Sequence, residues 1–294
     1  MRRCHVYSSL FSYLFLYLTV LLLWVPGKQK IPAWSVSLII SVILGLINHQ
    51  LELVALVPII LLAFAVYYSQ AEKMFIFMRI ISGLLVIVLS IGLAAHKFPG
   101  FHNLKVLDNV YLSTNAAPFT FYLNFDKTIV GIFILGIGFQ LVSTKKEWML
   151  LFKQLLLKAP IVILSIIIAA YILGFIKFDP KVPDSIWLWM VTNLLFVCMA
   201  EEAFFRGFLQ KNLALMMRKI RYGDYLALLI AAIFFGLAHY AGGIKFMALA
   251  AVAGLGYGWV YLTTKRIEGS ILTHFGLNLT HFLLFTYPAL VGAA

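Results

Sequence analysis

Residues 161–172 read Ile-Val-Ile-Leu-Ser-Ile-Ile-Ile-Ala-Ala-Tyr-Ile. The stretch is mostly apolar, and apolar and polar side chains do not alternate along it. A transmembrane β-strand alternates with a period of two over about ten residues, whereas a membrane helix needs about 20 mostly apolar residues. This stretch and the runs like it therefore predict membrane-spanning helices.

The composition of the whole chain supports the same class. Of its 294 residues, 63% are hydrophobic and 12% are charged, whereas soluble domains are about 45–50% apolar and about 25% charged. We therefore expect an all-α, polytopic transmembrane helical bundle of eight to ten spans. The apolar runs lie at about 7–25, 34–48, 52–69, 74–95, 128–143, 155–176, 186–209, 225–241, 246–264 and 271–287.

The chain carries a formal net charge of +12. The basic residues fall mainly between apolar runs, where membrane topology and lipid headgroups account for them. No basic-aromatic RNA motif is present, so the predicted partner is the bilayer and not nucleic acid. The basic loops at 145–158, 211–221 and 265–266 alternate onto one side, which we take as cytoplasmic. The connection at 97–127 and the C-terminus then lie outside, and 97–127 is expected to be an ordered loop.

The N-terminus begins Met1-Arg2-Arg3 and continues into the first apolar run. That run is longer than a signal-peptide core and no Ala-x-Ala site follows it, so we expect an uncleaved helix. If this basic N-terminus is cytoplasmic and the C-terminus lies outside, the number of spans is odd, which favours nine over ten. Cys4 and Cys198 form no Cys-x-x-Cys pair, and neither a disulfide nor a cysteine metal site is predicted.

Residues 199–210, Met-Ala-Glu-Glu-Ala-Phe-Phe-Arg-Gly-Phe-Leu-Gln, end the charge-free run 185–200. An ionised side chain near the bilayer centre costs about 2.5–3.5 kcal/mol on insertion scales. Glu52 and Arg79 stand near the ends of their runs, as snorkelling charges do. Glu201, Glu202 and Arg206, by contrast, place three charges within six residues, which indicates a functional site.

Helical spacing separates the two acids. Glu202 and Arg206 are four residues apart in the favourable order, which predicts an ion pair. Glu201 points about 100° away and is poorly placed to share that pair. A carboxylate in low dielectric is a stronger base than one in water, which suits a general base. The alternative is a helix end that emerges among headgroups with its charges solvated.

Two later runs carry further groups capable of catalysis. Phe235 precedes His239 by one turn, and His274 precedes Asn278 by one turn. A single histidine in a membrane helix is usually a hydrogen-bonded packing residue, but three helices that each bring such a group favour a shared site. Small residues would let these helices approach closely: Gly236, Gly254, Gly256 and Gly258.

The ordered motifs Glu-Glu-x-x-x-Arg, Phe-x-x-x-His and His-x-x-x-Asn resemble the CPBP family. This is the family of CAAX prenyl endopeptidases and bacteriocin-processing or bacteriocin-immunity proteins, also called Abi proteins. The resemblance covers about residues 185–285. It implies a catalytic, membrane-embedded helical core in 181–294, preceded in 1–180 by transmembrane helices that carry no recognisable motif.

The resemblance also implies roles for the motif residues. Glu201 would activate a water for attack on a peptide carbonyl, and His239 would help to hold that water. His274 and Asn278 would stabilise the tetrahedral oxyanion, and an amide is a suitable neutral donor for it. Glu202 and Arg206 would support the site.

Metal dependence is the open chemical question. Glu201, His239 and His274 could bind zinc, which takes N and O ligands and keeps one position open in catalytic sites. No His-Glu-x-x-His is present and asparagine is a poor zinc ligand, so we expect no cofactor, with zinc as the alternative. A serine nucleophile is less attractive, since no buried aspartate orients the histidine near Ser270.

The sequence therefore predicts an integral, multi-pass intramembrane endopeptidase that hydrolyses a membrane-associated protein or peptide. An ion- or proton-coupled transporter is one alternative, but no repeated half or broken-helix pair supports it. A non-catalytic binding or immunity-type protein is another, and the intact motifs argue against it. Prenylated tails, secreted peptide precursors and membrane sorting tails all remain as substrates, and the sequence gives no oligomeric state.

Overall fold

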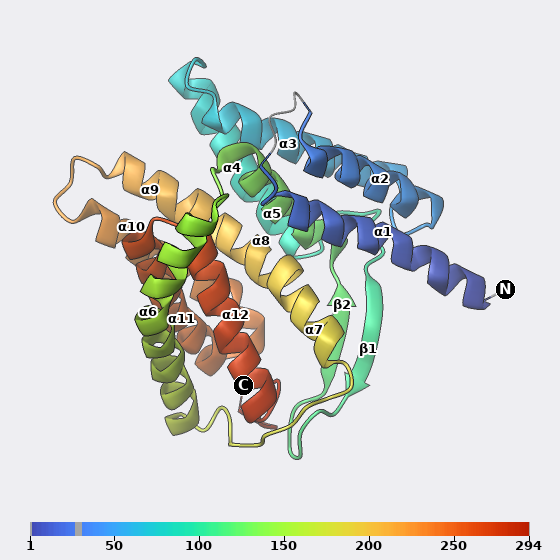
Figure 1. Cartoon of the computed structure of the whole chain (residues 1–294), viewed down its shortest axis with the longest axis vertical. Helices are drawn as coiled ribbons and strands as arrows, with labels where there is room; N and C mark the ends of the chain where they lie inside the picture. Colours follow the sequence, from blue (N-terminus) through green and yellow to red (C-terminus); the bar gives the residue numbers. More distant parts are fainter. Residues whose placement is uncertain (1, 27–30, 294) are drawn as a thin grey trace. The chain divides into compact units, whose positions relative to one another are not determined.

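The computed structural model describes residues 2–26 and 31–293, and the side chains of the first helix from Leu10 onward. The side chain of Cys4 and the basic start Met1-Arg2-Arg3 lie outside these described side chains, whereas Cys198 is a buried thiol. Helices dominate the described chain, and one small sheet accompanies them (Figure 1). The predicted all-α polytopic class is confirmed.

Five helices among the described residues are long and apolar enough to cross a membrane. Three shorter apolar helices follow other predicted apolar runs, and the predicted number of eight to ten spans stays a prediction. The long ones are Leu53–Gln70, Ile76–Ala94, Lys145–Ile172, Ile186–Met216 and Ile244–Thr264, and the shorter ones are Leu10–Leu22, Ala33–Ile47 and Gly223–Ala238.

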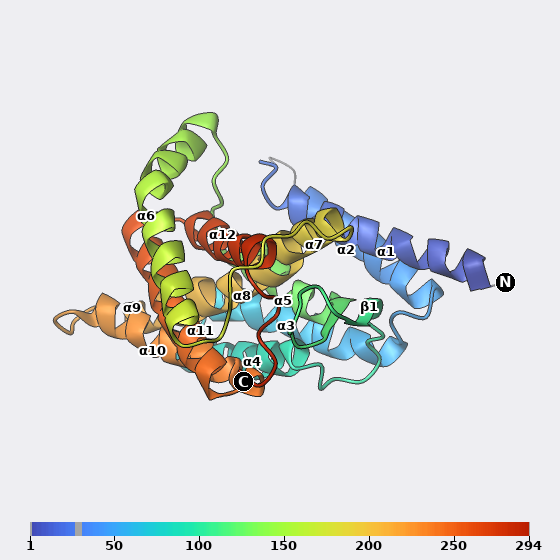
Figure 2. The same cartoon turned by 90° about the horizontal axis from the view of Figure 1, so that it is seen from below.

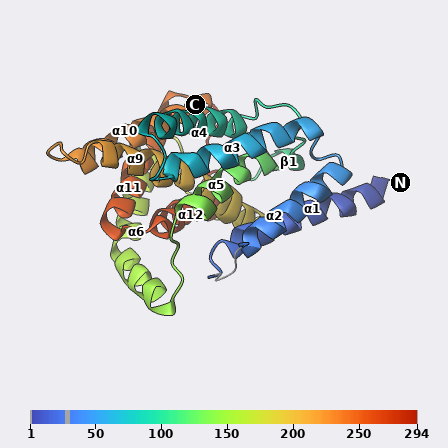
Figure 3. The same cartoon turned by 90° about the horizontal axis from the view of Figure 1, so that it is seen from above.

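The chain divides into two compact units, and the first comprises 1–105, 122–143 and 195–200. In it α1 lies beside α2, and α3 beside α4 (Figures 1 and 3). Most side chains of α5 are buried, as expected for a helix that is apolar all round. The helices are α1 (Arg2–Leu22), α2 (Ala33–Ile47), α3 (Leu56–Gln70), α4 (Ile76–Ala94) and α5 (Phe125–Gly138).

Two carboxylates in this unit have local partners. Asp126 in the first turn of α5 is 2% exposed and lies 2.7 Å from Nδ1 of His96. Asn103 donates to the other oxygen of the same carboxylate at 3.0 Å. Glu52 is exposed and lies 2.7 Å from Nε2 of His102, as expected for a charge at a helix end.

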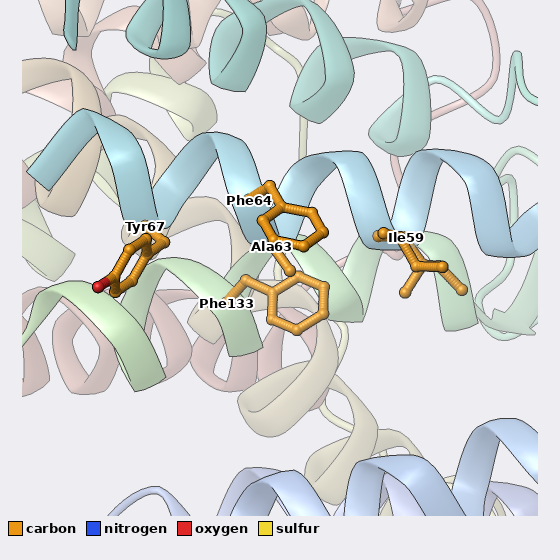
Figure 4. A pocket seen from close by; sticks show the side chains of 6 residues that line it. Ile59, Ala63, Phe64, Tyr67 and Phe133 are labelled. Atoms are coloured by element: carbon orange, nitrogen blue, oxygen red, sulfur yellow. The ribbon is translucent and has the colours of Figure 1, made fainter. Parts of the chain in front are cut away.

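A shallow apolar pocket of about 280 Å³ lies between α3 and α5 (Figure 4). Ile59, Ala63 and Phe64 contribute from α3, together with Tyr67, and Phe133 contributes from α5. Its lining is almost wholly hydrocarbon, as expected for a surface that faces lipid tails.

The connection at 97–127 is ordered, as predicted, but it contains a sheet that the sequence analysis did not predict. Strands β1 (Leu104–Val110) and β2 (Phe119–Leu123) form a two-stranded sheet. Asn109 and Asn115 adopt left-handed backbone conformations with φ of 50° and 58°. Asparagine tolerates this region better than most residues, which suits it to the ends of strands and to turns.

The second unit comprises 106–121, 144–194 and 201–294. Thr144 and Glu147 form a capping box that starts α6. Helices α10 and α11 run side by side (Figure 2), and α6 packs against both α11 and α12. The helices are α6 (Lys145–Ile172), α7 (Ile186–Thr192), α8 (Met199–Glu202), α9 (Lys211–Met216), α10 (Gly223–Ala238), α11 (Ile244–Thr264) and α12 (Ile267–Leu284).

Glycines allow the close contact between α10 and α11, as predicted. A Cβ on Gly236 would lie 2.7 Å from Cβ of Ala251, and one on Gly254 would lie 3.1 Å from Cα of Ala232. Both distances are below ordinary van der Waals contact. The two backbones therefore approach closely because these side chains are absent.

Candidate active site

The two adjacent acids lie on a helix that runs from Ile186 to Met216. Two π-helical segments interrupt it, Asn193–Cys198 before the acids and Ala203–Gln210 after them. Such segments are uncommon and occur frequently at functional sites. The sequence analysis assumed regular α-helical spacing and did not predict them.

The predicted pair of Glu202 and Arg206 is confirmed. Nη1 of Arg206 lies 3.0 Å from Oε1 of Glu202, and both side chains are fully buried. Nη2 of Arg206 donates to the carbonyl oxygen of Gly254 at 2.9 Å, and its guanidinium lies 4.6 Å from the ring centre of Phe235. Arg206 therefore joins its own helix to α10 and α11.

His274 on α12 contacts the same ion pair. Its Nδ1 lies 2.9 Å from Oε1 of Glu202, and its ring stacks on Tyr257 at 4.5 Å. A carboxylate beside a guanidinium only accepts hydrogen bonds, so Nδ1 of His274 carries a proton. The ring is held on two sides, and its Nε2 lies 3.9 Å from Oε2 of Glu201.

His239 approaches Glu201 from the end of α10. Its Nδ1 donates to the carbonyl oxygen of Phe235 at 2.7 Å. That bond fixes the tautomer, because a carbonyl oxygen cannot donate. Nε2 of His239 then lies 3.9 Å from Oε2 of Glu201, the same oxygen that His274 approaches.

The carboxylate of Glu201 thus lies between two imidazoles that come from two other helices. Its side chain is 12% exposed. Both separations of 3.9 Å exceed a direct hydrogen bond. Polar groups at such a separation are commonly bridged by water. The arrangement can therefore hold a water against one carboxylate oxygen and an imidazole nitrogen.

Asn278 lies one turn beyond His274 on α12. Its Nδ2 donates to Oδ1 of Asn193 at 3.1 Å. Asn193 is 7% exposed and opens the first π-helical segment. The sequence analysis missed Asn193, although an amide inside the charge-free run 185–200 was a signal that could have found it. Tyr257, which stacks on His274, gave no comparable signal.

Two other polar side chains near the motifs have structural contacts. The hydroxyl of Ser270 is fully buried and donates to the carbonyl oxygen of Tyr257 at 2.9 Å, which agrees with the view that it is not a nucleophile. Nε2 of His281 donates to the carbonyl oxygen of Thr286 at 3.0 Å, so this histidine holds the segment after α12.

The three polar groups are spaced more widely than the ligands of a zinc site. Neighbouring ligands in a tetrahedral zinc site with bonds of about 2.1 Å are about 3.4 Å apart. Oε2 of Glu201 lies 3.9 Å from each histidine nitrogen. In the part of the chain that the structure describes, no three His, Cys, Asp or Glu side chains are arranged to hold a metal ion. No step below is therefore assigned to a metal.

Residues 183–280 match the family model of the Rce1-like type II CAAX prenyl endopeptidases. The match covers about a third of the chain, includes every motif residue discussed above, and confirms the predicted resemblance to CAAX prenyl endopeptidases. Searches of curated proteins and of solved structures gave no match. Together with the long apolar helices, the family match indicates an integral, multi-pass membrane protein.

Proposed function

We propose that this chain, whose residues 183–280 match the Rce1-like type II CAAX prenyl endopeptidases, is an intramembrane endopeptidase that uses Glu201 as its general base. The family match supports a membrane protease in general. The observation that carries the specific proposal is the position of Oε2 of Glu201, 3.9 Å from Nε2 of both His239 and His274.

Water activation follows from this spacing. A water can lie at about 2.8 Å from both the carboxylate and Nε2 of His239. Glu201 takes one proton as the water oxygen forms a bond to the peptide carbonyl carbon, and His239 accepts a hydrogen bond from the remaining O–H. Glu201 then gives the proton to the departing nitrogen as the carbon–nitrogen bond breaks.

The charge on the tetrahedral oxygen needs donors, and α12 can supply them. Glu201, Glu202 and Arg206 together carry one excess negative charge, which a protonated His274 balances. Its Nδ1–H bonds Glu202 and its Nε2–H is directed to the oxyanion. The amide nitrogen of Asn278 carries two N–H groups, and one of them is held by Asn193. We assign the other to the oxyanion.

The first test replaces Glu201 with glutamine, which keeps the shape of the side chain and removes the base. We expect the Glu201→Gln variant to lose about 100-fold or more of its cleavage rate, because a general base contributes about that much. Comparative proteomics of membrane peptides, with and without the active protein, provides the substrates to measure.

The matched control is Glu52→Gln, which removes an exposed carboxylate of the other unit. This variant should cleave at the wild-type rate, and both variants should accumulate to the wild-type level. Unaltered processing by Glu201→Gln would remove Glu201 from the mechanism. Loss of processing in both variants would show that the effect is not specific to Glu201.

Metal dependence is tested separately on the purified protein. We expect cleavage to survive treatment with a chelator and the zinc content to stay well below one ion per chain, since the ligand spacing is too wide. One zinc per chain, lost together with activity in His239→Ala, would favour the zinc alternative instead.

A further inference from the structure

A polar pocket lies in the second unit, at the end of the helix that carries Glu201 and Arg206. Its volume is about 350 Å³. It lies where α9 ends, α10 begins and α11 ends, beside the turn at the left of Figure 1. None of the motif residues lines it. Its polar lining consists of Gln210, Lys211, Arg218, Asp224, Tyr261 and Lys265.

Positive charge dominates this lining, with three cationic side chains and one acidic side chain. Among the described side chains, those of 10–26 and 31–293, no salt bridge involves Arg218, Lys265 or Asp224. Arg218 and Lys265 therefore line the pocket without a paired carboxylate within salt-bridge distance. A pocket of this kind between membrane helices attracts an anionic headgroup.

Gln210 adds a different kind of group. It is 2% exposed, and its Nε2 donates to the carbonyl oxygen of Gly258 at 3.1 Å. Its Oε1 is buried and has no hydrogen-bond partner among the described residues. This oxygen faces α11, since a Cβ built on Gly258 would lie 2.8 Å from it. Gln210 therefore holds the wall of the pocket against α11, and the cations are the groups that would recognise a phosphate.

The apolar part of the pocket favours a lipid over a soluble phosphate. Leu215 lines the pocket and is 56% exposed, and Leu262 lines it from α11. The next residue, Met216, is 80% exposed. These side chains lie next to the cations, at the end of an apolar helix. The acyl chains of a lipid whose headgroup is bound in the pocket would extend along them. The pocket also belongs to the basic loops that the sequence places on the cytoplasmic side.

We propose that this pocket binds the headgroup of an anionic phospholipid, with Arg218 and Lys265 on the phosphate. Phosphatidylglycerol has this chemistry. The site is separate from the proposed endopeptidase chemistry and does not depend on it.

The test uses the full chain in phosphatidylcholine nanodiscs that contain an increasing fraction of phosphatidylglycerol, with retained lipid counted by native mass spectrometry. Wild-type protein should retain phosphatidylglycerol over phosphatidylcholine. Arg218→Gln with Lys265→Gln should need about 30-fold more phosphatidylglycerol for the same occupancy, from about 1 kcal/mol for each basic residue near the surface.

The matched control is Lys219→Gln with Arg221→Gln, which removes the same amount of charge from the turn that carries Arg218 but spares the pocket lining. It should retain lipid as the wild type does. Equal loss in both double variants would show diffuse attraction to the membrane surface and overturn the proposal. So would wild-type protein that retains no excess of phosphatidylglycerol.

A third arm separates lipid from free phosphate. Glycerol phosphate added to pure phosphatidylcholine nanodiscs should bind weakly, and it should compete with phosphatidylglycerol for the wild type. Tight binding of glycerol phosphate with no retention of phosphatidylglycerol would assign the pocket to a soluble phosphate and refute the lipid.

Discussion

Arg206 is fully buried, and three kinds of neighbour compensate for the loss of water around its charge. Glu202 supplies the opposite charge, the carbonyl oxygen of Gly254 accepts a hydrogen bond, and the ring face of Phe235 provides a cation–π contact. Its neighbours come from several helices, so the charge also holds the site together. A buried ion pair of this kind is costly to break from one side.

Replacing Arg206 with methionine should therefore destabilise the protein strongly. The change leaves the carboxylate of Glu202 buried without its guanidinium, at a cost of about 3–5 kcal/mol. We expect a much lower yield of folded protein and a lower melting temperature in detergent. The double variant Glu202→Gln with Arg206→Met should recover part of the loss, and normal yields from the single variant would contradict the pairing.

The Glu202–Arg206 pair could be predicted from sequence because it depends only on spacing within one helix. The contacts of His274 with Glu202 and of Asn278 with Asn193 join positions 72 and 85 residues apart. Helical periodicity does not carry that information, and the kinds of residue on the three helices together with the family resemblance indicated only that the motifs meet. Asn193 was missed because a neutral amide in an apolar run does not stand out as a charge does.

At the scale of the elements, the contact between α10 and α11 depends on missing side chains. Gly236 has the tightest requirement, since a Cβ there would lie 2.7 Å from Cβ of Ala251 and 2.8 Å from the carbonyl oxygen of Met247. The second of these atoms belongs to the backbone and cannot move alone. The helix contact in turn positions Phe235 beneath Arg206 and His239 beside Glu201.

Gly236→Val should push α10 away from α11. Overpacking of a close contact costs about 1–3 kcal/mol, and here it also moves His239. We expect a lower melting temperature together with a loss of cleavage in the protein that remains folded. Gly276→Ala is the control, because its Cβ would meet only the end of the Ile163 side chain at 2.9 Å. If both variants keep the same melting temperature and cleavage rate, the close contact between α10 and α11 is not needed for either property.

The apolar helices of both units were predictable because each follows from an uninterrupted apolar run. The β1–β2 hairpin was not, since its strands are short and the run 97–127 lacks a clear alternation. The π-helical segments were not predictable either, because they change the turn of a helix and leave its hydrophobicity unchanged.

Across the whole molecule, the basic residues give the chain a direction in the membrane. The loops around 145–158, 211–221 and 265–266 were assigned to one side by alternation of the apolar runs. The structure corrects one of these assignments, because 145–158 is the first part of helix α6 and not a loop. Glu147 at the start of α6 pairs with Arg266 at 2.6 Å, so these two basic segments lie at the same end of the second unit, as the alternation requires.

Cysteine labelling tests the direction itself. In a background with Cys4→Ser and Cys198→Ser, we expect Lys219→Cys to react with a membrane-impermeant maleimide only when the cytoplasmic side is opened. Ser113→Cys, in the segment between β1 and β2, should react in intact cells. The reverse pattern would invert the topology, and labelling of both from one side would show that the number of crossings between them is even.

The family match at 183–280 falls inside the predicted core of 181–294. The division into a core and a preceding set of helices remains a prediction, and so does the role of each motif residue. Composition and the charge of the loops were sufficient to predict a helical, multi-pass membrane protein, because the bilayer restricts the structures that can cross it.

The π-helical segment Ala203–Gln210 separates Glu201 from the cationic pocket along a single helix. Residues in a π-helix turn by less than the 100° of an α-helix, so this segment contains a residue more than α-helical winding needs. A deletion of one residue within it would restore α-helical winding while the residues beyond it kept nearly the same orientation, and Gln210 would stay beside Gly258. The segment can therefore absorb a change of one residue in length without turning the two acids relative to the pocket, whereas the same deletion in a regular α-helix would rotate everything beyond it by about 100°.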